Sequence, residues 1–509
     1  MTPERVQSHS DHPDRPADDV LVVGAGPTGL LLAGDLATAG LRVTLLERRD
    51  RESNLTRAFA VHARTLEQLD ARGLADDLIA TGTPLTSLRL LGRVTVDLAG
   101  LPTRFPFVLI TPQSHTERLL ERRALDAGAV IVRGARVTAL RQDGSGVELD
   151  AEEAAPDGGG SRTVTRRAAY AVGTDGVRST VRDLLGIPFP GDTVISSVIL
   201  ADVRLEQATA KVVTVGANEQ GFVFVAPFGD GWFRVVAWDR ARQLPDDAPV
   251  ELDDLRDITR RVLGSDHGMY DPRGMSRFHC DERQAPVYRK GRVLLAGDAA
   301  HCHSPAGGMG MNTGLQDAAN LGWKLAATIR GWAAPGLLDS YQKERHPVGR
   351  AVLRTSGGLI RTVVAQSVPV RLVRRTVPAL TGRFGPLARR GGRTVSGIGI
   401  SYAAQAPGGA HRLTGRRIPD LRLDHDAPAS AKEPVRLYEA LRSGRFVLVG
   451  PHPERGAPWA DRLHCAAPAG ALHTTLLVRP DGYAAWAAEE PTREQTRAAL
   501  LRHLGPEGS

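Results

Sequence analysis

The N-terminal part of the chain alternates between short apolar runs and a segment with helical spacing. Residues 20–23 are all apolar, a helical stretch follows, and a second, mostly apolar run over 43–46 ends at the acid Glu47. Apolar runs of this length that are joined by a helix are typical of parallel strands covered on both faces of a sheet. Residues 19–48 are therefore predicted to form a strand, a glycine turn, a helix and a second strand.

Helical and extended patterns continue to alternate after this unit. Apolar positions over 62–78 have helical spacing and are interrupted by Gly73, and residues 85–104 have the pattern of short strands. A helix is expected from 117 to 127, with Ser114 as its N-cap and Glu117 completing a capping box.

Two strands are expected next, over 129–133 and 136–140. A polar, glycine-rich stretch over 142–161 is expected to be an exposed hairpin tip, from which the chain returns through an apolar segment.

From Val194 to Trp238 the pattern becomes that of successive strands, separated by Gly, Asp and Pro. The expected strands are 198–203, 212–215, 221–226 and 232–238. Because no helix intervenes, an antiparallel sheet is predicted, completed by a helix near 252–263. We expect this inserted unit to form an apolar wall for a substrate.

The last third of the chain begins with another buried strand. Residues 292–296 run into Gly297 and Asp298, a proline- and glycine-rich loop follows, and a helix is expected over about 313–330. Residues 395–509 have the pattern of a separate small α/β domain. Its expected elements are strands at 447–449 and 474–478 and a helix at 492–504 with a capping box between Thr492 and Gln495.

The turn between the first strand and the first helix has the sequence Gly24-Ala25-Gly26-Pro27-Thr28-Gly29. In a strand–turn–helix unit this spacing is the dinucleotide fingerprint. Gly24 permits the tight turn, Gly26 lets the backbone approach a pyrophosphate, and Gly29 lets the helix pack closely on the strand. A pyrophosphate would bind at the helix N-terminus, and Glu47 would accept hydrogen bonds from a ribose.

Length and composition limit the number of domains and the class of protein. A chain of 509 residues with 42% hydrophobic residues is expected to form two to four domains with large cores. It contains no run of 18 apolar residues, so no transmembrane helix is predicted. Residues 1–18 are polar and are expected to be a disordered lead-in and no signal peptide. The three cysteines form no CxxC pair, which favours a cytoplasmic protein without a thiolate cluster.

The net charge of +8 is unevenly distributed. No acid occurs between Glu344 and Asp420, whereas thirteen arginines lie from Arg350 to Arg417. A block of this kind is compatible with nucleic acid or an anionic membrane surface. Prolines interrupt it and no stacking aromatic pattern accompanies it, so we interpret it as a solvated connector that binds neither.

Three motifs stand in order along the chain: GAGPTG at 24–29, TDGVRSTVR at 174–182 and GRVLLAGDAAH at 291–301. Together with Arg283-Gln284-Ala285 they resemble the single-component (class A) FAD-dependent aromatic hydroxylases of the p-hydroxybenzoate hydroxylase type, and above all the bacterial aromatic polyketide hydroxylases. The resemblance implies an α/β fold: a Rossmann-like FAD-binding domain, an inserted antiparallel-sheet substrate domain and a thioredoxin-like C-terminal domain, which lacks CxxC here. The implied limits are 19–84, 105–190 and 280–345 for the FAD-binding domain, 85–104 and 191–279 for the substrate domain, 346–394 for a basic helical connector and 395–509 for the C-terminal domain.

The resemblance also assigns cofactor-binding residues. The FAD-binding positions it implies are Gly24, Gly26, Pro27, Thr28, Gly29, Glu47, Arg48, Arg57, Gln113, Val137, Asp175, Asp298, Pro305, Gly310, Met311 and Asn312. Arg57, Arg178 and Arg182 are the candidates for NAD(P)H. Backbone N–H groups near Asn312 would stabilise negative charge on the reduced flavin. The family often has cysteine or alanine at position 174, and the threonine here is expected to matter little.

The implied activity is hydroxylation of a large phenolic or quinoid polyketide by NADPH (or NADH) and O2, through a C4a-hydroperoxyflavin, in secondary metabolism. The cofactor supplies the chemistry, and the protein orients the reactants and excludes water. Baeyer–Villiger oxidation or oxidative ring rearrangement of the same substrates is the near alternative. A flavin halogenase is disfavoured because no WxWxIP stretch occurs, and a nucleotide- or nucleic-acid-binding protein is the remote alternative. A monomer or a homodimer is expected.

No residue of the sequence stands out as a catalytic acid or base. His62, His115 and Tyr288 are candidates for a base acting on the substrate, although a structural role is favoured for each. His301 and His303 flank Cys302, but no further ligand accompanies them, so no metal site is predicted.

Overall fold

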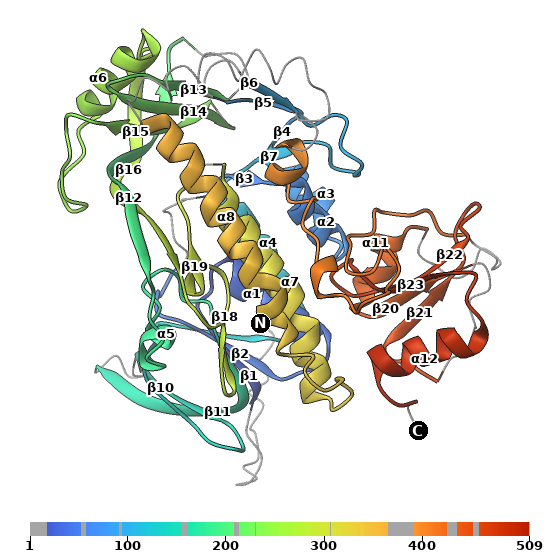
Figure 1. The fold of residues 1–509 in the computed structure, drawn as a ribbon. Coiled ribbons are helices and arrows are strands. Elements are labelled where there is room, and N and C mark those ends of the chain that lie inside the picture. Colours follow the sequence, from blue (N-terminus) through green and yellow to red (C-terminus); the bar gives the residue numbers. More distant parts are fainter. Residues whose placement is uncertain are drawn as a thin grey trace, which may run out of the picture.

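A parallel sheet forms the centre of the molecule in the computed structural model (Figure 1). The structure describes residues 18–51, 58–90, 94–154, 160–207, 213–229, 231–305, 307–364, 391–424, 435–450 and 458–507. The expected lead-in therefore lies outside the described residues, apart from residue 18, which begins the first strand.

The central sheet has eight strands, six of which follow one another in the order β17-β18-β11-β1-β2-β8. They are β1 (Asp18–Val23), β2 (Val43–Glu47), β8 (Val130–Arg133), β11 (Ser161–Gly173), β17 (Arg289–Lys290) and β18 (Val293–Leu295). All neighbours along this path are parallel except β17, which is antiparallel to β18. The predicted strand–helix–strand unit over 19–48 is confirmed.

Two further strands extend the sheet through β11, and one of them corrects the prediction. β9 (Arg136–Gln142) pairs with β10 (Val147–Ala154), which pairs with β11. The expected hairpin tip over 142–161 is thus mostly strand. Val147, Leu149 and Ala151 are buried on alternate positions of β10, whereas the acids between them made this stretch look like a polar loop.

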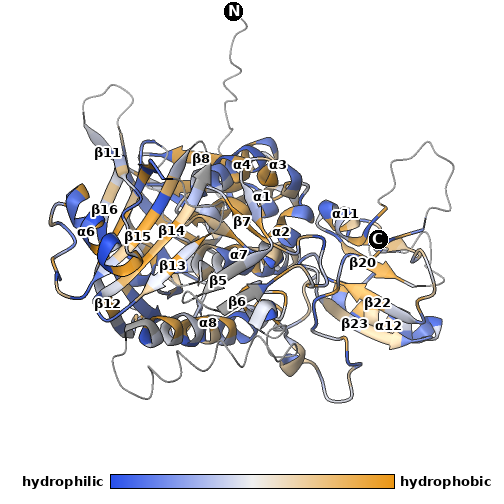
Figure 2. Ribbon diagram, turned by 90° about the horizontal axis from the view of Figure 1, so that it is seen from above, coloured by the Kyte–Doolittle hydropathy of each residue, from blue (hydrophilic) through white to orange (hydrophobic). Residues whose placement is uncertain are grey.

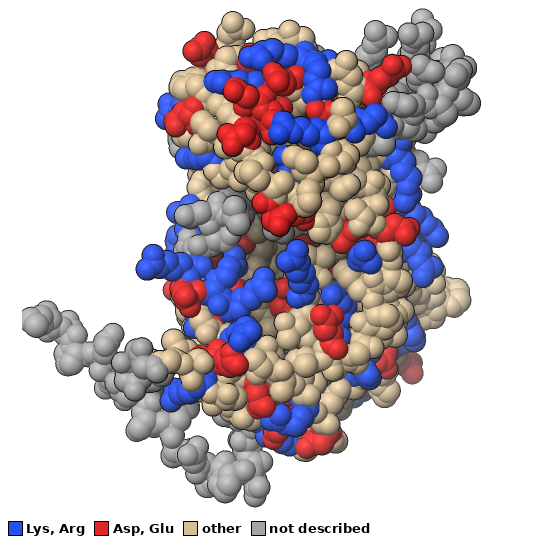
Figure 3. All heavy atoms as spheres, turned by 90° about the vertical axis from the view of Figure 1, so that its left-hand side faces the viewer, with Lys and Arg blue, Asp and Glu red and all other residues tan. Residues whose placement is uncertain are grey.

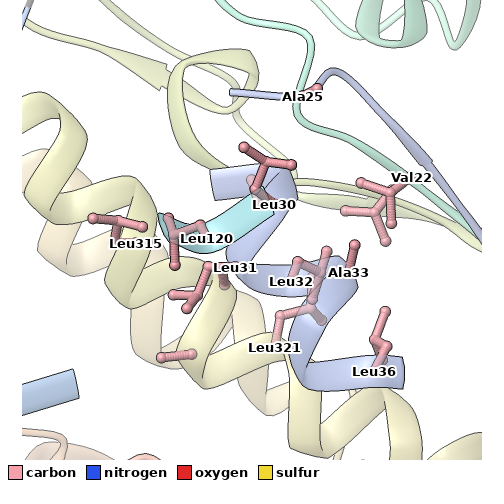
Figure 4. Close-up of a cluster of buried hydrophobic side chains, with 14 of the residues drawn as sticks. Val22, Ala25, Leu30, Leu31, Leu32, Ala33, Leu36, Leu120, Leu315 and Leu321 are labelled. Carbon is pink, nitrogen blue, oxygen red and sulfur yellow. The ribbon is translucent and has the colours of Figure 1, made fainter. Parts of the chain in front are cut away.

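Of three helices beside this sheet, one packs against the other two: α1 (Pro27–Thr38) contacts both α4 (Gln113–Asp126) and α7 (Met309–Ile329) (Figure 4). α1 is apolar on all sides and is buried, with Leu30, Leu31 and Leu32 each at most 1% exposed. The N-cap of α4 is Pro112 and makes no side-chain bond, so the predicted capping box at Ser114 is wrong.

Short elements fill the region between residues 58 and 110. They are β3 (Ala60–Val61), α2 (Ala63–Asp70), α3 (Ala75–Ile79), β4 (Thr83–Leu85), β5 (Ser87–Leu90), β6 (Val94–Asp97) and β7 (Val108–Ile110). β3, β7 and β4 form a small sheet, and β5 and β6 form a hairpin. α5 (Thr180–Leu184) follows the second motif.

The second sheet has six strands in the order β13-β14-β15-β12-β16-β19 and is antiparallel throughout, as predicted for residues 194–238. Its strands are β12 (Gly191–Leu205), β13 (Thr214–Ala217), β14 (Gly221–Gly229), β15 (Trp232–Asp239), β16 (Met269–Gln284) and β19 (His301–Cys302). α6 (Leu252–Leu263) covers one face and has the predicted bounds. The edge strand β19 was not predicted and comes from the third motif.

A helix of 25 residues, α8 (Ser340–Val364), crosses the molecule from α7 to the second sheet (Figure 1). The expected boundary at residue 345 falls inside this helix. Residues 365–390 lie outside the described residues. They make up most of the part of the expected basic connector that follows α8.

The C-terminal part has a four-stranded sheet in the order β21-β20-β22-β23, with β20 and β21 parallel and the other pairs antiparallel. Its elements are α11 (Leu437–Ala440), β20 (Phe446–Val449), β21 (Leu463–Ala466), β22 (Thr474–Val478), β23 (Ala484–Glu489) and α12 (Arg493–Leu504), whose predicted capping box at Thr492 is confirmed. The strands are largely apolar (Figure 2). Within the described residues, no helix of the protein is long and apolar enough to span a bilayer.

Candidate active site

The three sequence motifs meet at one edge of the central sheet. β18, β11, β1 and β2 are adjacent and parallel, so their carboxyl ends lie side by side. Gly24 follows β1, Glu47 ends β2, Asp175 follows β11, and Asp298 follows β18. The crevice beyond the carboxyl ends of parallel strands is the usual place for a ligand in such sheets.

The glycine turn is locked to the second motif by close contacts. Gly24 has φ +103°, and a Cβ there would lie 2.6 Å from the carbonyl oxygen of Thr174. A Cβ on Gly29 would lie 2.0 Å from the carbonyl oxygen of Gly24. The Thr174 hydroxyl donates to the carbonyl oxygens of Val23 (2.8 Å) and Gly24 (2.9 Å). The Thr174 hydroxyl thus joins the two turns, a contact that the sequence did not indicate and that alanine could not make.

Gly26 has the opposite surroundings and borders open space. A Cβ on Gly26 would find no heavy atom within 4 Å. Gly26 is the N-cap of α1 and Pro27 is its first residue, so the free N–H groups of the first turn lie beside this space. An anionic group such as a pyrophosphate fits this position.

Glu47 is 4% exposed and closes the other side of the turn. It accepts hydrogen bonds from the backbone N–H of Ala25 (2.7 Å) and from the backbone and side chain of Arg49 (3.0 and 2.9 Å). Burial raises its pKa, but these hydrogen bonds outweigh burial and lower it overall. Glu47 is thus held as a carboxylate, the form that accepts hydrogen bonds from a ribose.

Asp175 organises the turn before α5. It accepts from the Ser179 hydroxyl (2.5 Å) and the backbone N–H of Val181 (3.1 Å), and burial raises its pKa. Arg178 is exposed. Arg182 is 5% exposed, donates to the carbonyl oxygens of Ala299 and Val177, and lies over the ring of Phe189. Arg182 therefore links the second motif to the third, and Arg178 is the one that faces solvent.

The third motif interlocks with the first through Thr28. A Cβ on Gly297 would lie 2.7 Å from the Thr28 hydroxyl oxygen, and a Cβ on Gly314 would lie 2.3 Å from it. Helix α1, the turn after β18 and helix α7 thus meet at one threonine. Asp298, next to Gly297, is exposed while both its neighbours are buried, so its carboxylate borders the open side of the site.

The first turn of α7 faces the same region. Pro305 is exposed, and Gly310 and Met311 are partly buried. Asn312 is buried; its side chain accepts from the backbone N–H of His62 (2.8 Å) and donates to the carbonyl oxygens of Ala60 and Gly308. The Asn312 amide thus clamps β3 to the start of α7, and only backbone N–H groups of this turn remain for a ligand.

The remaining predicted cofactor positions lie around the ends of β2 and α4. Arg48 is exposed and follows Glu47. Gln113 bonds the backbone of Ala58 and the side chain of Glu117. Val137 is buried in β9. Arg57 lies outside the described residues.

The three candidate bases have structural surroundings. Burial lowers the pKa of His62 to about 4, and its imidazole bonds the backbone of Gly307 and Val395. His115 lies 3.3 Å from the Thr111 hydroxyl. Tyr288 is buried, accepts from Gln284 at 2.7 Å, and burial raises its pKa far above the usual value.

Aromatic residues of the second sheet face the site region. On the face opposite α6, Phe222 stacks on Trp238, and Phe224 contacts Phe59, which precedes β3. Arg234 is buried on this face and forms a bidentate pair with Asp202 (2.8 and 2.9 Å). Sequence reasoning missed this pair, whose only signal was a charge in an otherwise apolar strand.

The surface of the molecule is hollowed on the side of β12 and β16. The hollow lies between the upper part, which contains α6 and the second sheet, and the lower part, which contains the central sheet (Figure 3). Lys and Arg side chains gather along its lower side, and such a basic rim attracts anionic ligands.

These features fit FAD. A helix N-terminus beside an open glycine, a carboxylate at the end of the neighbouring strand and an exposed acid after a third strand match the pyrophosphate, ribose and ribityl parts of that cofactor.

Comparison with known proteins agrees with this geometry. Residues 17–356 match a family model described as an FAD binding domain, and residues 411–506 match one described as the C-terminal domain of aromatic-ring hydroxylases. A rifampicin monooxygenase from Streptomyces venezuelae is 39% identical over 487 residues, which cover 94% of this chain and 97% of the relative.

A 12-dehydrotetracycline 5-monooxygenase/anhydrotetracycline 6-monooxygenase from Streptomyces rimosus subsp. rimosus is 38% identical over 519 residues and covers 96% of this chain and 99% of its own. The solved structure of the anhydrotetracycline hydroxylase OxyS from Streptomyces rimosus superposes with a TM-score of 0.83 at 38% identity, over 96% of this chain and all of its own.

Proposed function

The chain belongs to the FAD-binding aromatic-ring hydroxylases, and from this premise we propose that it hydroxylates a large multi-ring phenolic or quinoid compound of the polyketide type. It is an FAD-dependent aromatic monooxygenase. The resemblance inferred from the three motifs is confirmed. Family membership disfavours both the halogenase and the nucleic-acid-binding alternatives.

The observation that carries the assignment of the site is the convergence of four strand ends. We assign the pyrophosphate of FAD to Gly26 and the first turn of α1, the adenosine ribose to Glu47, and the ribityl chain to Asp298. Asp175 acts indirectly, by shaping the turn that Thr174 bonds to Gly24. Bound FAD, reduced by NAD(P)H, would supply the electrons that activate O2 for oxygen transfer.

The protein contributes orientation and exclusion of water. The backbone N–H groups at the start of α7 are directed to one end of the site, where they stabilise negative charge. For NAD(P)H we propose Arg178, which is exposed beside the second motif, in preference to the buried Arg182. The basic rim of the hollow supports entry of an anionic dinucleotide on that side.

The aromatic face of the second sheet supports a large apolar substrate. Phe59 and Phe224 are partly buried and in contact, and planar rings can stack on them, whereas Phe222 and Trp238 behind them are buried in a core with Ile360 of α8. The relatives' names specify rifampicin and anhydrotetracycline, which are large multi-ring compounds. The name of the structural neighbour, an anhydrotetracycline hydroxylase, favours hydroxylation over Baeyer–Villiger cleavage, whereas the name monooxygenase covers both reactions.

The strand order of the C-terminal sheet, with one parallel pair followed by two antiparallel pairs and a terminal helix, supports a thioredoxin-like domain. Its single described cysteine, Cys465, is a free thiol, so we assign the domain a structural role. The free thiols Cys280, Cys302 and Cys465 support a reducing, cytoplasmic location.

The test is a screen of candidate substrates with the purified protein. The protein should be yellow, and a multi-ring phenol should stimulate NADPH oxidation with little release of peroxide. The product formed with labelled O2 should gain one oxygen atom as a new hydroxyl group. Retention of FAD with no stimulation by any polycyclic phenol would reject the substrate class, and a colourless protein would reject the site. A product of the same mass that carries the oxygen in a new ester or lactone, or its ring-opened hydrolysis product, would favour the Baeyer–Villiger alternative.

A further inference from the structure

Two histidines of the third motif form a buried stack with an acid of α7. The rings of His301 and His303 are 4.9 Å apart and nearly parallel, and Nδ1 of His301 lies 2.9 Å from Nε2 of His303. The other nitrogen of His301, Nε2, lies 2.5 Å from Oδ2 of Asp317. His301 and Asp317 are both fully buried.

Asp317 is held as a carboxylate. Arg345 donates to its Oδ1 from Nε at 2.6 Å, and the backbone N–H of Gly297 donates to its Oδ2 at 3.1 Å. Burial raises the pKa of Asp317, but its interactions with His301 and Arg345 outweigh burial and bring it to about 2. A carboxylate only accepts hydrogen bonds, so Nε2 of His301 must carry a hydrogen.

The remaining hydrogens follow for a neutral His301, because in a neutral imidazole one nitrogen donates and the other accepts. With its hydrogen on Nε2, a neutral His301 accepts at Nδ1, so Nε2 of His303 is the donor between the rings and Nδ1 of His303 is bare. Burial lowers the pKa of His303 well below its usual value, which agrees with a neutral His303 ring.

Nδ1 of His303 is buried, and none of the described residues makes a hydrogen bond to it. A Cβ on Gly310 would lie 3.6 Å from this nitrogen and 3.9 Å from Oδ1 of Asp298. The nitrogen therefore lies behind the first turn of α7, beside the acid that we assign to the ribityl chain.

We propose that Nδ1 of His303 accepts a hydrogen bond from a hydroxyl group of a molecule bound in the site, and that His301 and Asp317 let it accept the proton of an acidic hydroxyl. The proposal deepens the proposed function, because it adds a residue to the same site. When Nδ1 of His303 takes a proton, Nε2 of His303 gives its own to Nδ1 of His301. The ligand becomes an oxyanion, and the positive charge rests on His301 beside the Asp317 carboxylate.

Two hydroxyl classes are available, and they differ in acidity. A ribityl hydroxyl of FAD is too weak an acid to give up its proton and would only donate a hydrogen bond. A phenol of the substrate is acidic enough to transfer it, and a phenolate ring is more readily attacked by an electrophilic oxygen. In both cases the same nitrogen is the acceptor.

The test reads the imidazole directly. Two-bond ¹H–¹⁵N spectra of histidine-labelled protein distinguish bare, hydrogen-bonded and protonated nitrogens, and loss of signals in H303Q assigns His303. We expect a bare Nδ1 in apoprotein. A shift of this signal on adding FAD indicates the ribityl source, and a shift only on adding a phenolic probe to holoenzyme indicates the substrate.

Variants give an independent readout. H303L should weaken the binding of whichever ligand shifts the Nδ1 signal by about 5-fold, the loss expected for one hydrogen bond. H303Q keeps an acceptor oxygen and should weaken this binding less. H473Q, at an exposed position, is the matched control. A hydrogen on Nδ1 in the apoprotein, or an Nδ1 signal that responds to neither ligand, overturns the proposal. Normal FAD binding in those samples would leave the proposed function intact.

Discussion

At the scale of single residues, two glycines of one turn differ in backbone conformation and in the space around them. Gly24 has a positive φ and no room for a Cβ, whereas Gly26 has an ordinary φ of −79° and open space in front of it. Gly24 is therefore required by the fold, whereas Gly26 leaves the space that we assign to the pyrophosphate.

Alanine at each position separates these roles. G26A should lower the melting temperature of the apoprotein only slightly, as expected for alanine at an N-cap, but weaken FAD binding at least about tenfold, because the methyl group occupies the approach of the pyrophosphate. G24A should lower the melting temperature of the apoprotein, since its Cβ would lie 2.6 Å from a carbonyl oxygen. Flavin fluorescence and thermal melts measure both, and full FAD affinity in G26A would contradict the assignment.

A buried histidine makes stability depend on pH. The pKa of His62 falls from 6.5 to about 4 on folding because of burial. Between these values the unfolded chain binds a proton that the folded chain does not, so stability decreases as the pH falls through this window. The full loss attributable to His62 is about 3 kcal/mol.

The H62Q substitution isolates the contribution of His62 to this pH dependence. H62Q should flatten the decrease in melting temperature between pH 6.5 and 4, whereas H473Q, at an exposed position, should keep the wild-type slope. Equal slopes in H62Q and wild type would show that His62 is already protonated in the folded protein.

Residues that shape a local turn were predictable from the sequence. Residues that bond a partner far along the chain were not. Gly24, Gly26 and Glu47 follow from one local unit. The bonds of Asn312 to residues 60 and 62 join segments 250 residues apart, so no local pattern could indicate them.

At the scale of elements, α1, α7 and the turn after β18 depend on one contact at Thr28. G314A would bring a methyl group 2.3 Å from the Thr28 hydroxyl and 3.2 Å from Cα of Gly297. Overpacking of this kind costs about 1–3 kcal/mol.

A double-mutant cycle tests the contact. T28A should recover part of the loss in G314A, because it removes the hydroxyl that clashes. G358A, in an open position of α8, should be neutral or stabilising by up to about 1 kcal/mol. Urea unfolding measures all four variants, and additive effects of T28A and G314A would contradict the contact.

Elements whose apolar residues recur with a clear helical or strand spacing were predicted closely. Elements without such a clear spacing were missed. The amphipathic α6 has the predicted bounds. β10 was overlooked because acids occupy its outward positions, and β19 because two residues carry no period at all. Its pairing is decided by β16 across the sheet.

At the scale of the whole molecule, the C-terminal part is attached through buried charges. Arg479 donates to both oxygens of Glu344 on α8 (2.8 and 2.9 Å) and to Asp481 (2.9 Å). Glu344 also accepts from Lys324 of α7, and Arg64 of α2 donates to the carbonyl oxygen of Asp481 (2.5 Å). Four segments distant in sequence share this network.

Removing Arg479, the central cation of this network, should lower the stability of the protein. R479M leaves Glu344 and Asp481 buried with less positive charge and should destabilise the protein by about 3–5 kcal/mol. R497M, at a position 65% exposed, is the control and should have little effect. Thermal melts of the holoenzyme compare them, and a wild-type melting temperature in R479M would show that the network contributes no stability.

A mixed α/β fold with several sheets was foreseeable from the sequence patterns, but the attachment of the C-terminal part was not. The arginine block illustrates this: Arg417 is not a solvated charge, because it pairs with buried Glu67 of α2. An ion pair between residues 350 positions apart leaves no trace in local composition.

The pairing of β19 with β16 has a consequence for engineering. Gln284 pairs with His301 and Arg283 with Cys302, so the last strand of the inserted part of the second sheet is hydrogen-bonded to the segment that begins the loop before α7. A chimera that grafts residues 191–284 from a relative must therefore bring matching residues at 301 and 302, or this strand pairing will be lost. Exchange of the second sheet and exchange of this loop are thus coupled in the fold.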